Sequence, residues 1–84
     1  PIDVLIAITT SGNSGNILKA LESAKVNKVP SVVFTGAGRG KLPDGTDIMH
    51  VPSVETARIQ ECHILIGHII CGLVESTIFS SLRP

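Results

Sequence analysis

The densest group of side chains able to do chemistry lies in residues 9–16, which read Thr-Thr-Ser-Gly-Asn-Ser-Gly-Asn. Four of these residues carry hydroxyl groups, namely Thr9, Thr10, Ser11 and Ser14. They stand between an expected strand and an expected helix start, where free backbone N–H groups and the positive helix end favour an anion. The segment predicts a phosphate cradle without Lys or Arg. An alternative that the residues leave equally open is a turn in which Ser14 only caps the helix.

A second glycine-rich segment, Gly36-Ala-Gly-Arg-Gly40, does not have the spacing of a nucleotide-binding loop. No GK[ST] sequence and no G-x-G-x-x-G sequence is present in the chain, and no helix is expected to open on this segment. We interpret it as a flexible rim loop, from which Arg39 could reach a bound anion.

The last predicted helix carries a third group of polar residues, comprising Arg58, Gln60, Glu61, His63 and His68. The first four lie near its start, where a helix leaving the carboxyl edge of a parallel sheet passes the usual ligand crevice. His68 is flanked by isoleucines and a leucine that should desolvate it, and a histidine in such a place is more often a hydrogen-bonded core residue than a catalyst. Gln60 and His68 are ~12 Å apart along the helix axis and about 80° apart around it, so only long side chains would converge. His50 is interpreted as structural.

The elements that must position these groups follow the order β-α-β-β-α. Apolar, β-branched runs predict strands at 3–10, 31–35 and 47–51, and helical spacing predicts helices from Ile17 to about Lys28 and from Val54 to about Phe79. Ser53 is the expected N-cap of the second helix, with Glu55 favoured by the helix dipole. Continuous apolar strands need helices on both faces, so we predict a parallel α/β sheet.

Between Ile64 and Val74 the last helix is apolar nearly all round. This run is interrupted by Gly67, His68 and Gly72 and is shorter than the ~20 residues of a membrane span, so we expect an enclosed helix with core and subunit contacts rather than a membrane partner. Three strands and two helices should nevertheless leave a sheet edge and much of this helix uncovered. The sequence therefore predicts a piece of a larger structure.

Composition excludes other classes of protein. The 84 residues include 43% hydrophobic and 17% charged residues, two phenylalanines and a formal net charge of zero, so the basic field and stacking platform of a nucleic-acid binder are absent. No charged n-region or cleavage site is seen, and a cytoplasmic location is the expectation. Cys62 and Cys71 would lie roughly 13 Å apart on one helix, which predicts free thiols that act as small buried hydrophobes.

The runs DVLIAITTSGNSGNILKAL, FTGAGRGKL, DIMHVPS and above all TARIQECHILIGHIICGLVE resemble the carboxyl-terminal part of bacterial phosphoheptose isomerases of the sugar-isomerase (SIS) superfamily. The resemblance covers essentially the whole chain, so residues 1–84 are expected to be the carboxyl-terminal portion of a single SIS domain. It implies a flavodoxin-like, three-layer α/β sandwich with a five-stranded parallel sheet, assembled as a homotetramer. It also implies conversion of sedoheptulose 7-phosphate to D-glycero-D-manno-heptose 7-phosphate through an enediol(ate), early in heptose synthesis for lipopolysaccharide or other surface glycans.

The resemblance assigns roles to six residues. Thr9, Thr10, Ser11 and Ser14 match positions that hold the sugar phosphate, Gln60 matches a residue that touches substrate and ligates zinc, and His68 matches a catalytic acid/base that also ligates zinc. The loop and His68 are expected to face one hollow. The family's catalytic glutamate and its other metal ligands have no counterpart in these residues, so the chain alone should be inactive. The rivals are a non-catalytic SIS protein that binds a phosphosugar or a replication initiator, which would lack a histidine at position 68, and a bare interaction module.

Overall fold

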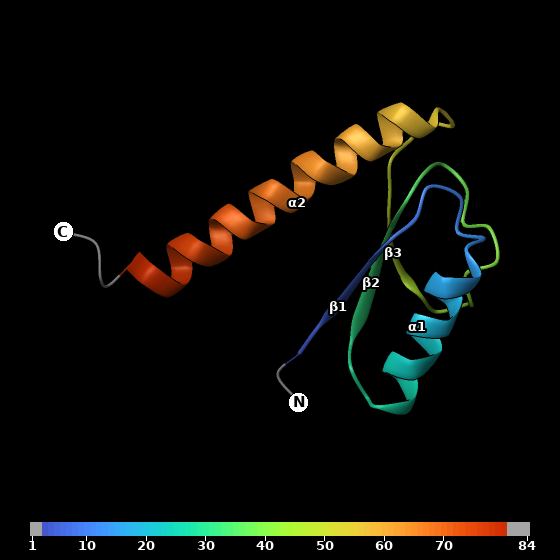
Figure 1. Cartoon of the computed structure of the whole chain (residues 1–84), viewed down its shortest axis with the longest axis horizontal. Helices are drawn as coiled ribbons and strands as arrows, with labels where there is room; N and C mark the ends of the chain where they lie inside the picture. Colours follow the sequence, from blue (N-terminus) through green and yellow to red (C-terminus); the bar gives the residue numbers. More distant parts are fainter. Residues whose placement is uncertain (1–2, 81–84) are drawn as a thin grey trace.

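A computed structural model describes residues 3–80, which form three parallel strands and two helices (Figure 1). The strands are β1 (Leu5–Ile8), β2 (Ser31–Thr35) and β3 (Asp47–His50), and the sheet order is β1-β2-β3. The register pairs Leu5 with Ser31 and Val32 with Asp47. The helices are α1 (Gly15–Val26) and α2 (Thr56–Phe79). The predicted element order and the parallel sheet are confirmed.

The two helices cover opposite faces of the sheet. Ala7 and Val33 form a core cluster on one face with Leu21 of α1 and Leu42. Phe34, which follows Val33 and therefore points to the other face, lies 5.9 Å from the His63 ring of α2, measured between ring centroids. The result is the predicted three-layer α/β arrangement, in which β2 is central and the most buried strand.

The strands expected at 3–10 and 47–51 are shorter in the structure, as β1 (Leu5–Ile8) and β3 (Asp47–His50), and the helix boundaries also differ from the expectation. α1 ends at Val26 rather than near Lys28, because Asn27 caps it and Lys28 adopts a positive φ of 59°. α2 begins at Thr56, with Glu55 at the N-cap, so the expected N-cap at Ser53 is wrong. The Ser53 hydroxyl oxygen instead accepts a hydrogen bond from the Glu55 N–H at 3.0 Å, which forms a turn just before the helix.

The second face of the sheet is only partly covered by this chain. On β1, the side chains of Ile6 and Ile8 are 42% and 52% exposed, so the expected burial on both faces is wrong for this strand in the single chain. α2 contacts the sheet through its first turns, where Ile59 and His63 are buried, and then extends beyond the sheet (Figure 1). The uncovered sheet face agrees with the deficit expected for three strands and two helices.

The helix expected to be enclosed is therefore exposed over most of its length. Seven large apolar side chains of α2 are exposed: Ile64, Leu65, Ile69, Leu73, Val74, Ile78 and Phe79. The physical reason is that beyond His63 the described part of the chain covers α2 only in part and on one side, where Ile66 and Ile70 are half-buried. Within residues 3–80, α2 is also the one helix long and apolar enough to cross a membrane by length and composition. Cores of soluble proteins contain helices of the same composition, so the expectation of no membrane partner stays a prediction.

Candidate functional site

The hydroxyl-rich loop follows the carboxyl end of β1 and leads into α1. The Gly12 N–H donates to Thr9 Oγ1 at 3.2 Å, and the Asn13 N–H donates to Ser11 Oγ at 3.1 Å. Both hydroxyls act as acceptors in these bonds, so their own O–H groups remain available as donors. Thr9 is buried and Ser11 is exposed. The backbone thus fixes two of the four hydroxyls in place.

Ser14 is the N-cap residue of α1, but its side chain makes no capping hydrogen bond. The interpretation in which Ser14 only caps the helix therefore loses its support, since the hydroxyl is exposed and does not serve the helix. The first N–H groups of any helix lack intrahelical acceptors, and α1 has no acidic residue in its first turn to repel an anion. This end of α1 therefore presents N–H and O–H donors, the groups that a phosphate accepts hydrogen bonds from.

Gln60 and His68 line a second feature, an open hollow between α2 and the end of β1. Its volume is about 440 Å³, and the lining residues are Ile8, Gln60, His63, Ile64, Gly67, His68 and Cys71. Gln60 and His68, which were expected to need long side chains to approach one ligand, thus line the same hollow. Gln60, His68 and Cys71 are the exposed residues of this lining that carry polar side chains.

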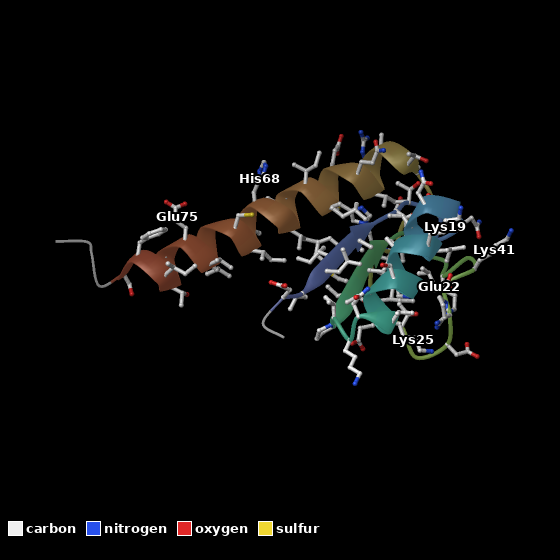
Figure 2. All side chains as sticks on the ribbon, turned by 60° about the horizontal axis from the view of Figure 1, so that its bottom comes forward. Lys19, Glu22, Lys25, Lys41, His68 and Glu75 are labelled. Atoms are coloured by element: carbon white, nitrogen blue, oxygen red, sulfur yellow. The ribbon has the colours of Figure 1, made fainter. Side chains whose placement is uncertain are left out.

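His68 is exposed, so the expectation that its apolar neighbours desolvate it is wrong for this chain. The reason is that His68 lies on the side of α2 turned away from the sheet, where Leu65 and Ile69 are also exposed, whereas Ile66 and Ile70 on the other side are half-buried. Figure 2 shows the His68 side chain projecting outward from the middle of α2. Cys62 and Cys71 are free thiols as predicted, but Cys71 is exposed rather than buried, for the same reason.

The two candidate groups do not share a hollow. None of the four hydroxyl residues lines the hollow at Gln60 and His68, so the expected common hollow is wrong for this chain alone. The groups are nevertheless neighbours along β1, because Ile8 lines the hollow and Thr9 begins the hydroxyl loop. A single site that includes both the hydroxyl loop and the hollow at Gln60 and His68 would need further residues from outside the described part of the chain.

His63 is a buried polar residue of α2. In the sequence it was grouped with the candidate site residues, because it lies near the start of the helix. It is 2% exposed, and its Nε2 lies 3.1 Å from the carbonyl oxygen of Thr35. A carbonyl oxygen can only accept, so Nε2 carries the hydrogen and donates. Nδ1 is buried with no hydrogen-bond partner among residues 3–80. The signal that could have found this role is the four-residue spacing from Ile59, which puts both residues on one helix face.

The remaining polar candidates have surface or structural partners. Arg58 and Glu61 pair with each other at 2.6 Å on the exposed side of α2. Arg39 donates from Nη2 to the Pro43 carbonyl oxygen at 2.6 Å, which directs its guanidinium toward the connector before β3. His50 Nδ1 lies 2.8 Å from the Gly36 carbonyl oxygen, in agreement with the structural role expected for it.

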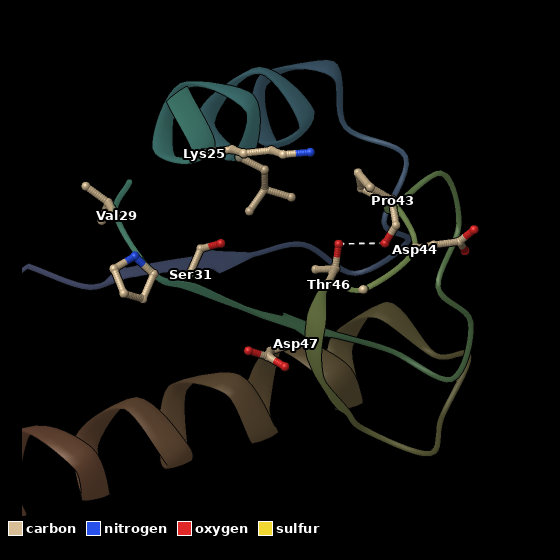
Figure 3. A pocket seen from close by; sticks show the side chains of 10 residues that line it. Lys25, Val29, Ser31, Pro43, Asp44, Thr46 and Asp47 are labelled. Atoms are coloured by element: carbon tan, nitrogen blue, oxygen red, sulfur yellow. Dashed lines mark hydrogen bonds between the residues drawn. The ribbon is translucent and has the colours of Figure 1, made fainter. Parts of the chain in front are cut away.

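A third hollow, of about 360 Å³, lies at the opposite end of the sheet (Figure 3). Ser31 and Asp47, the first residues of β2 and β3, line it together with Lys25 of α1. The Thr46 hydroxyl donates to the Pro43 carbonyl oxygen at 2.6 Å and closes the connector that forms one wall. Ligands of open parallel sheets bind at the carboxyl ends of the strands, so this hollow is not our candidate site.

The chain is similar in sequence to phosphoheptose isomerases of several bacteria. The chain is 49% identical over 81 residues to the phosphoheptose isomerase of Rhodospirillum rubrum and 56% identical over 78 residues to that of Aneurinibacillus thermoaerophilus. These alignments include 95% and 92% of this chain but 43% and 39% of the relatives. No family model matches the chain.

Solved structures give the same result. A phosphoheptose isomerase from Francisella tularensis superposes with a TM-score of 0.80 at 38% identity, over 88% of this chain and 41% of that chain. One from Neisseria gonorrhoeae superposes with a TM-score of 0.76 at 41% identity, over 86% of this chain and 42% of that chain. The chain spans less than half the length of these relatives, and the matched region is their carboxyl-terminal part. In sequence and in fold, the chain is therefore similar to the carboxyl-terminal part of bacterial phosphoheptose isomerases, with the SIS architecture that the motifs had indicated.

Proposed function

We propose that the intact protein is an aldose–ketose isomerase that converts sedoheptulose 7-phosphate to D-glycero-D-manno-heptose 7-phosphate. The observation that carries this proposal is the 49–56% identity to phosphoheptose isomerases across nearly the whole chain. The free hydroxyl and N–H donors at the start of α1 support it, because they suit the phosphate of such a sugar. The alternative, a non-catalytic phosphosugar-binding or replication-initiator-binding protein, is not favoured.

The proposed mechanism divides the work between the two candidate groups. Thr9, Thr10, Ser11 and Ser14 hold the phosphate, remote from the reacting carbons, so that its binding energy orients the sugar. A carboxylate from outside residues 3–80 and the His68 imidazole form the acid/base pair. One takes a proton from the carbon next to the carbonyl, giving an enediol(ate), and the other delivers a proton to the former carbonyl carbon, while a proton passes from the former hydroxyl oxygen to the former carbonyl oxygen. The exposure of His68 leaves its ring accessible to a substrate.

We propose zinc as a cofactor, with Gln60 and His68 among its ligands. The side chains fit in kind, since an imidazole nitrogen and an amide oxygen are donors that zinc accepts, and both line the same hollow. The described residues contain no cluster of three or more His, Cys, Asp or Glu side chains that could hold a metal ion. The remaining ligands would therefore come from elsewhere in the intact protein. Bound zinc would polarise the substrate oxygens or fix their geometry.

We further propose a homotetramer in the cytoplasm, without a nucleic-acid or membrane partner. The exposed apolar length of α2 supports an assembly, because an apolar helix surface of this extent is rarely left in water. Light scattering of the intact protein should report an oligomer without detergent. A stable monomer would remove the subunit-contact role of α2, and a requirement for detergent would instead favour a membrane role for it.

The proposed reaction is tested by incubating the intact protein with sedoheptulose 7-phosphate and measuring the aldose product. We expect conversion that depends on the phosphate, with sedoheptulose itself a far poorer substrate. Binding of the phosphosugar without conversion would favour a non-catalytic SIS protein. No binding and no conversion would favour an interaction module.

Replacing Ser14 by alanine should weaken substrate binding without weakening the fold. The Ser14 hydroxyl makes no capping bond in the structure, so the loss of helix stability expected on removing an N-cap side chain, ~1 kcal/mol, should be largely absent. One lost hydrogen bond to a charged phosphate should raise KM by roughly tenfold or more. Steady-state kinetics and thermal unfolding of the intact protein check both expectations.

Ser23→Ala is the matched control, since Ser23 is an exposed serine in a later turn of the same helix. It should leave KM unchanged. A Ser14→Ala variant with normal KM but lower stability would return Ser14 to the role of a helix cap.

A further inference from the structure

The glycine-rich segment that follows β2 is packed directly against the hydroxyl-rich loop. The Lys41 N–H donates to the Gly12 carbonyl oxygen at 3.0 Å, which ties the end of the glycine-rich segment to the centre of the hydroxyl loop. The Leu42 N–H donates to the Arg39 carbonyl oxygen at 3.1 Å, which closes a tight turn over residues 39–42. The two segments are thus joined backbone to backbone.

Two glycines make this contact possible. Gly12 has φ of 76° and Gly40 has φ of 55°, a region that residues with a side chain rarely adopt. A Cβ at Gly40 would collide with the Ser11 carbonyl oxygen and lie 2.7 Å from Asn13 Oδ1. A Cβ at Gly12 would collide with the Arg39 carbonyl oxygen and lie 2.9 Å from the Arg39 carbonyl carbon. Each glycine occupies the space that a side chain on the other would need.

The glycine-rich segment offers little that would make it a ligand site of its own. Arg39 is directed to the Pro43 carbonyl oxygen, away from a role as an anion contact. The Lys41 N–H, which could otherwise bind an anion, is used by the Gly12 carbonyl. The expectation of a flexible rim loop also fails to describe it, because its end is held against the hydroxyl loop by a hydrogen bond and by close backbone packing.

We propose that Gly40 is a positioning residue for phosphate binding, which acts by holding Ser11 and Gly12 at their places in the loop. This inference rests on the proposed function, since it takes residues 9–14 to be the phosphate site. The contact at Gly40 falls on the backbone of Ser11, whose hydroxyl is one of the four proposed phosphate donors. Any side chain at position 40 must therefore displace the Ser11 backbone, and its hydroxyl moves with it.

Three glycine-to-alanine variants of the intact protein separate this role from general strain. Gly40→Ala introduces both a positive-φ alanine and the collision with Ser11. Gly45→Ala introduces a positive-φ alanine in open space, since Gly45 has φ of 82° and a Cβ added there would have no neighbour within 4 Å. Gly38→Ala introduces neither, because its surroundings are open and its φ is not positive. Each is assayed for KM, kcat and thermal unfolding with sedoheptulose 7-phosphate.

We expect Gly40→Ala to raise KM by about tenfold to a hundredfold, the effect expected of a displacement of roughly 1 Å, with a smaller change in kcat. Gly45→Ala should lower thermal stability and leave KM unchanged, and Gly38→Ala should change neither. If Gly40→Ala and Gly45→Ala have the same normal KM, the positioning role is overturned. If the unsubstituted protein is inactive, the proposed function fails instead.

Hydrogen exchange on the unsubstituted intact protein tests the same idea should Gly40→Ala not fold. Saturating inorganic phosphate is expected to slow amide exchange in residues 9–14 and 39–42 together. Protection of residues 9–14 alone would overturn the coupling between the two segments. Protection of neither segment would overturn the phosphate site itself, and the inference with it.

Discussion

Replacing His68 by alanine in the intact protein is expected to lower kcat by about 10²- to 10⁴-fold, the range that loss of a general acid or base produces. His68 is exposed on α2 and is among the residues that line the hollow with Gln60, so its ring is accessible to a substrate. The fold should not change, because the part of the chain that the structure describes packs no core around this residue. Turnover of sedoheptulose 7-phosphate, measured beside thermal unfolding, checks both expectations.

Two further variants sharpen the interpretation of this result. His68→Gln retains a hydrogen-bonding side chain but cannot transfer a proton at neutral pH, so it should be nearly as inactive as His68→Ala. Ser76→Ala, at an exposed position two turns further along α2, should keep normal turnover. Near-normal kcat in His68→Ala would remove His68 from the mechanism, whereas a large loss of stability would show that it serves the fold.

The central strand β2 could be predicted from its local sequence pattern, because both of its faces are covered within this chain. Its residues Ser31 to Thr35 were predicted without error, since Val33 and Phe34 pack on opposite faces and a continuous apolar run is the signature of such a strand. β1 has an equally apolar sequence, but Ile6 and Ile8 are exposed. An apolar run predicts that both faces of a strand are buried, but it does not predict whether the same chain or another one buries them.

The two histidines of α2 show where prediction of the site failed. His68 has apolar neighbours in sequence and was expected to be desolvated, while His63 was grouped with the polar residues near the helix start. In the structure His63 is buried and His68 is exposed. Sequence neighbours on a helix point in different directions, so burial depends on which face meets the sheet. Ile59 and His63 share that face, and His68 lies on the opposite face of α2.

Replacing His63 by alanine should lower the free energy of unfolding by about 3 kcal/mol, a value typical of a large side chain removed from a core. The ring packs against Phe34, and its Nε2 donates to the Thr35 carbonyl oxygen, which belongs to a residue with no exposed surface. Alanine would leave a cavity and remove one of two hydrogen bonds to this oxygen, which also accepts from the Val51 N–H at 3.0 Å, although it also removes the unpartnered Nδ1. Denaturant unfolding of the intact protein gives the measurement.

A phenylalanine at position 63 separates packing from hydrogen bonding. It keeps the ring contact with Phe34 and removes both ring nitrogens, so the expected loss is about 1 kcal/mol, the value of one hydrogen bond, since the Thr35 carbonyl oxygen still accepts from the Val51 N–H. Gln60→Ala, one turn earlier and exposed, should change stability by less than about 0.5 kcal/mol. Equal stability of His63→Ala and the unsubstituted protein would mean that α2 does not dock on β2 through this ring. The hollow at Gln60 and His68 would then lose its wall, because the same docked turn holds it against β1.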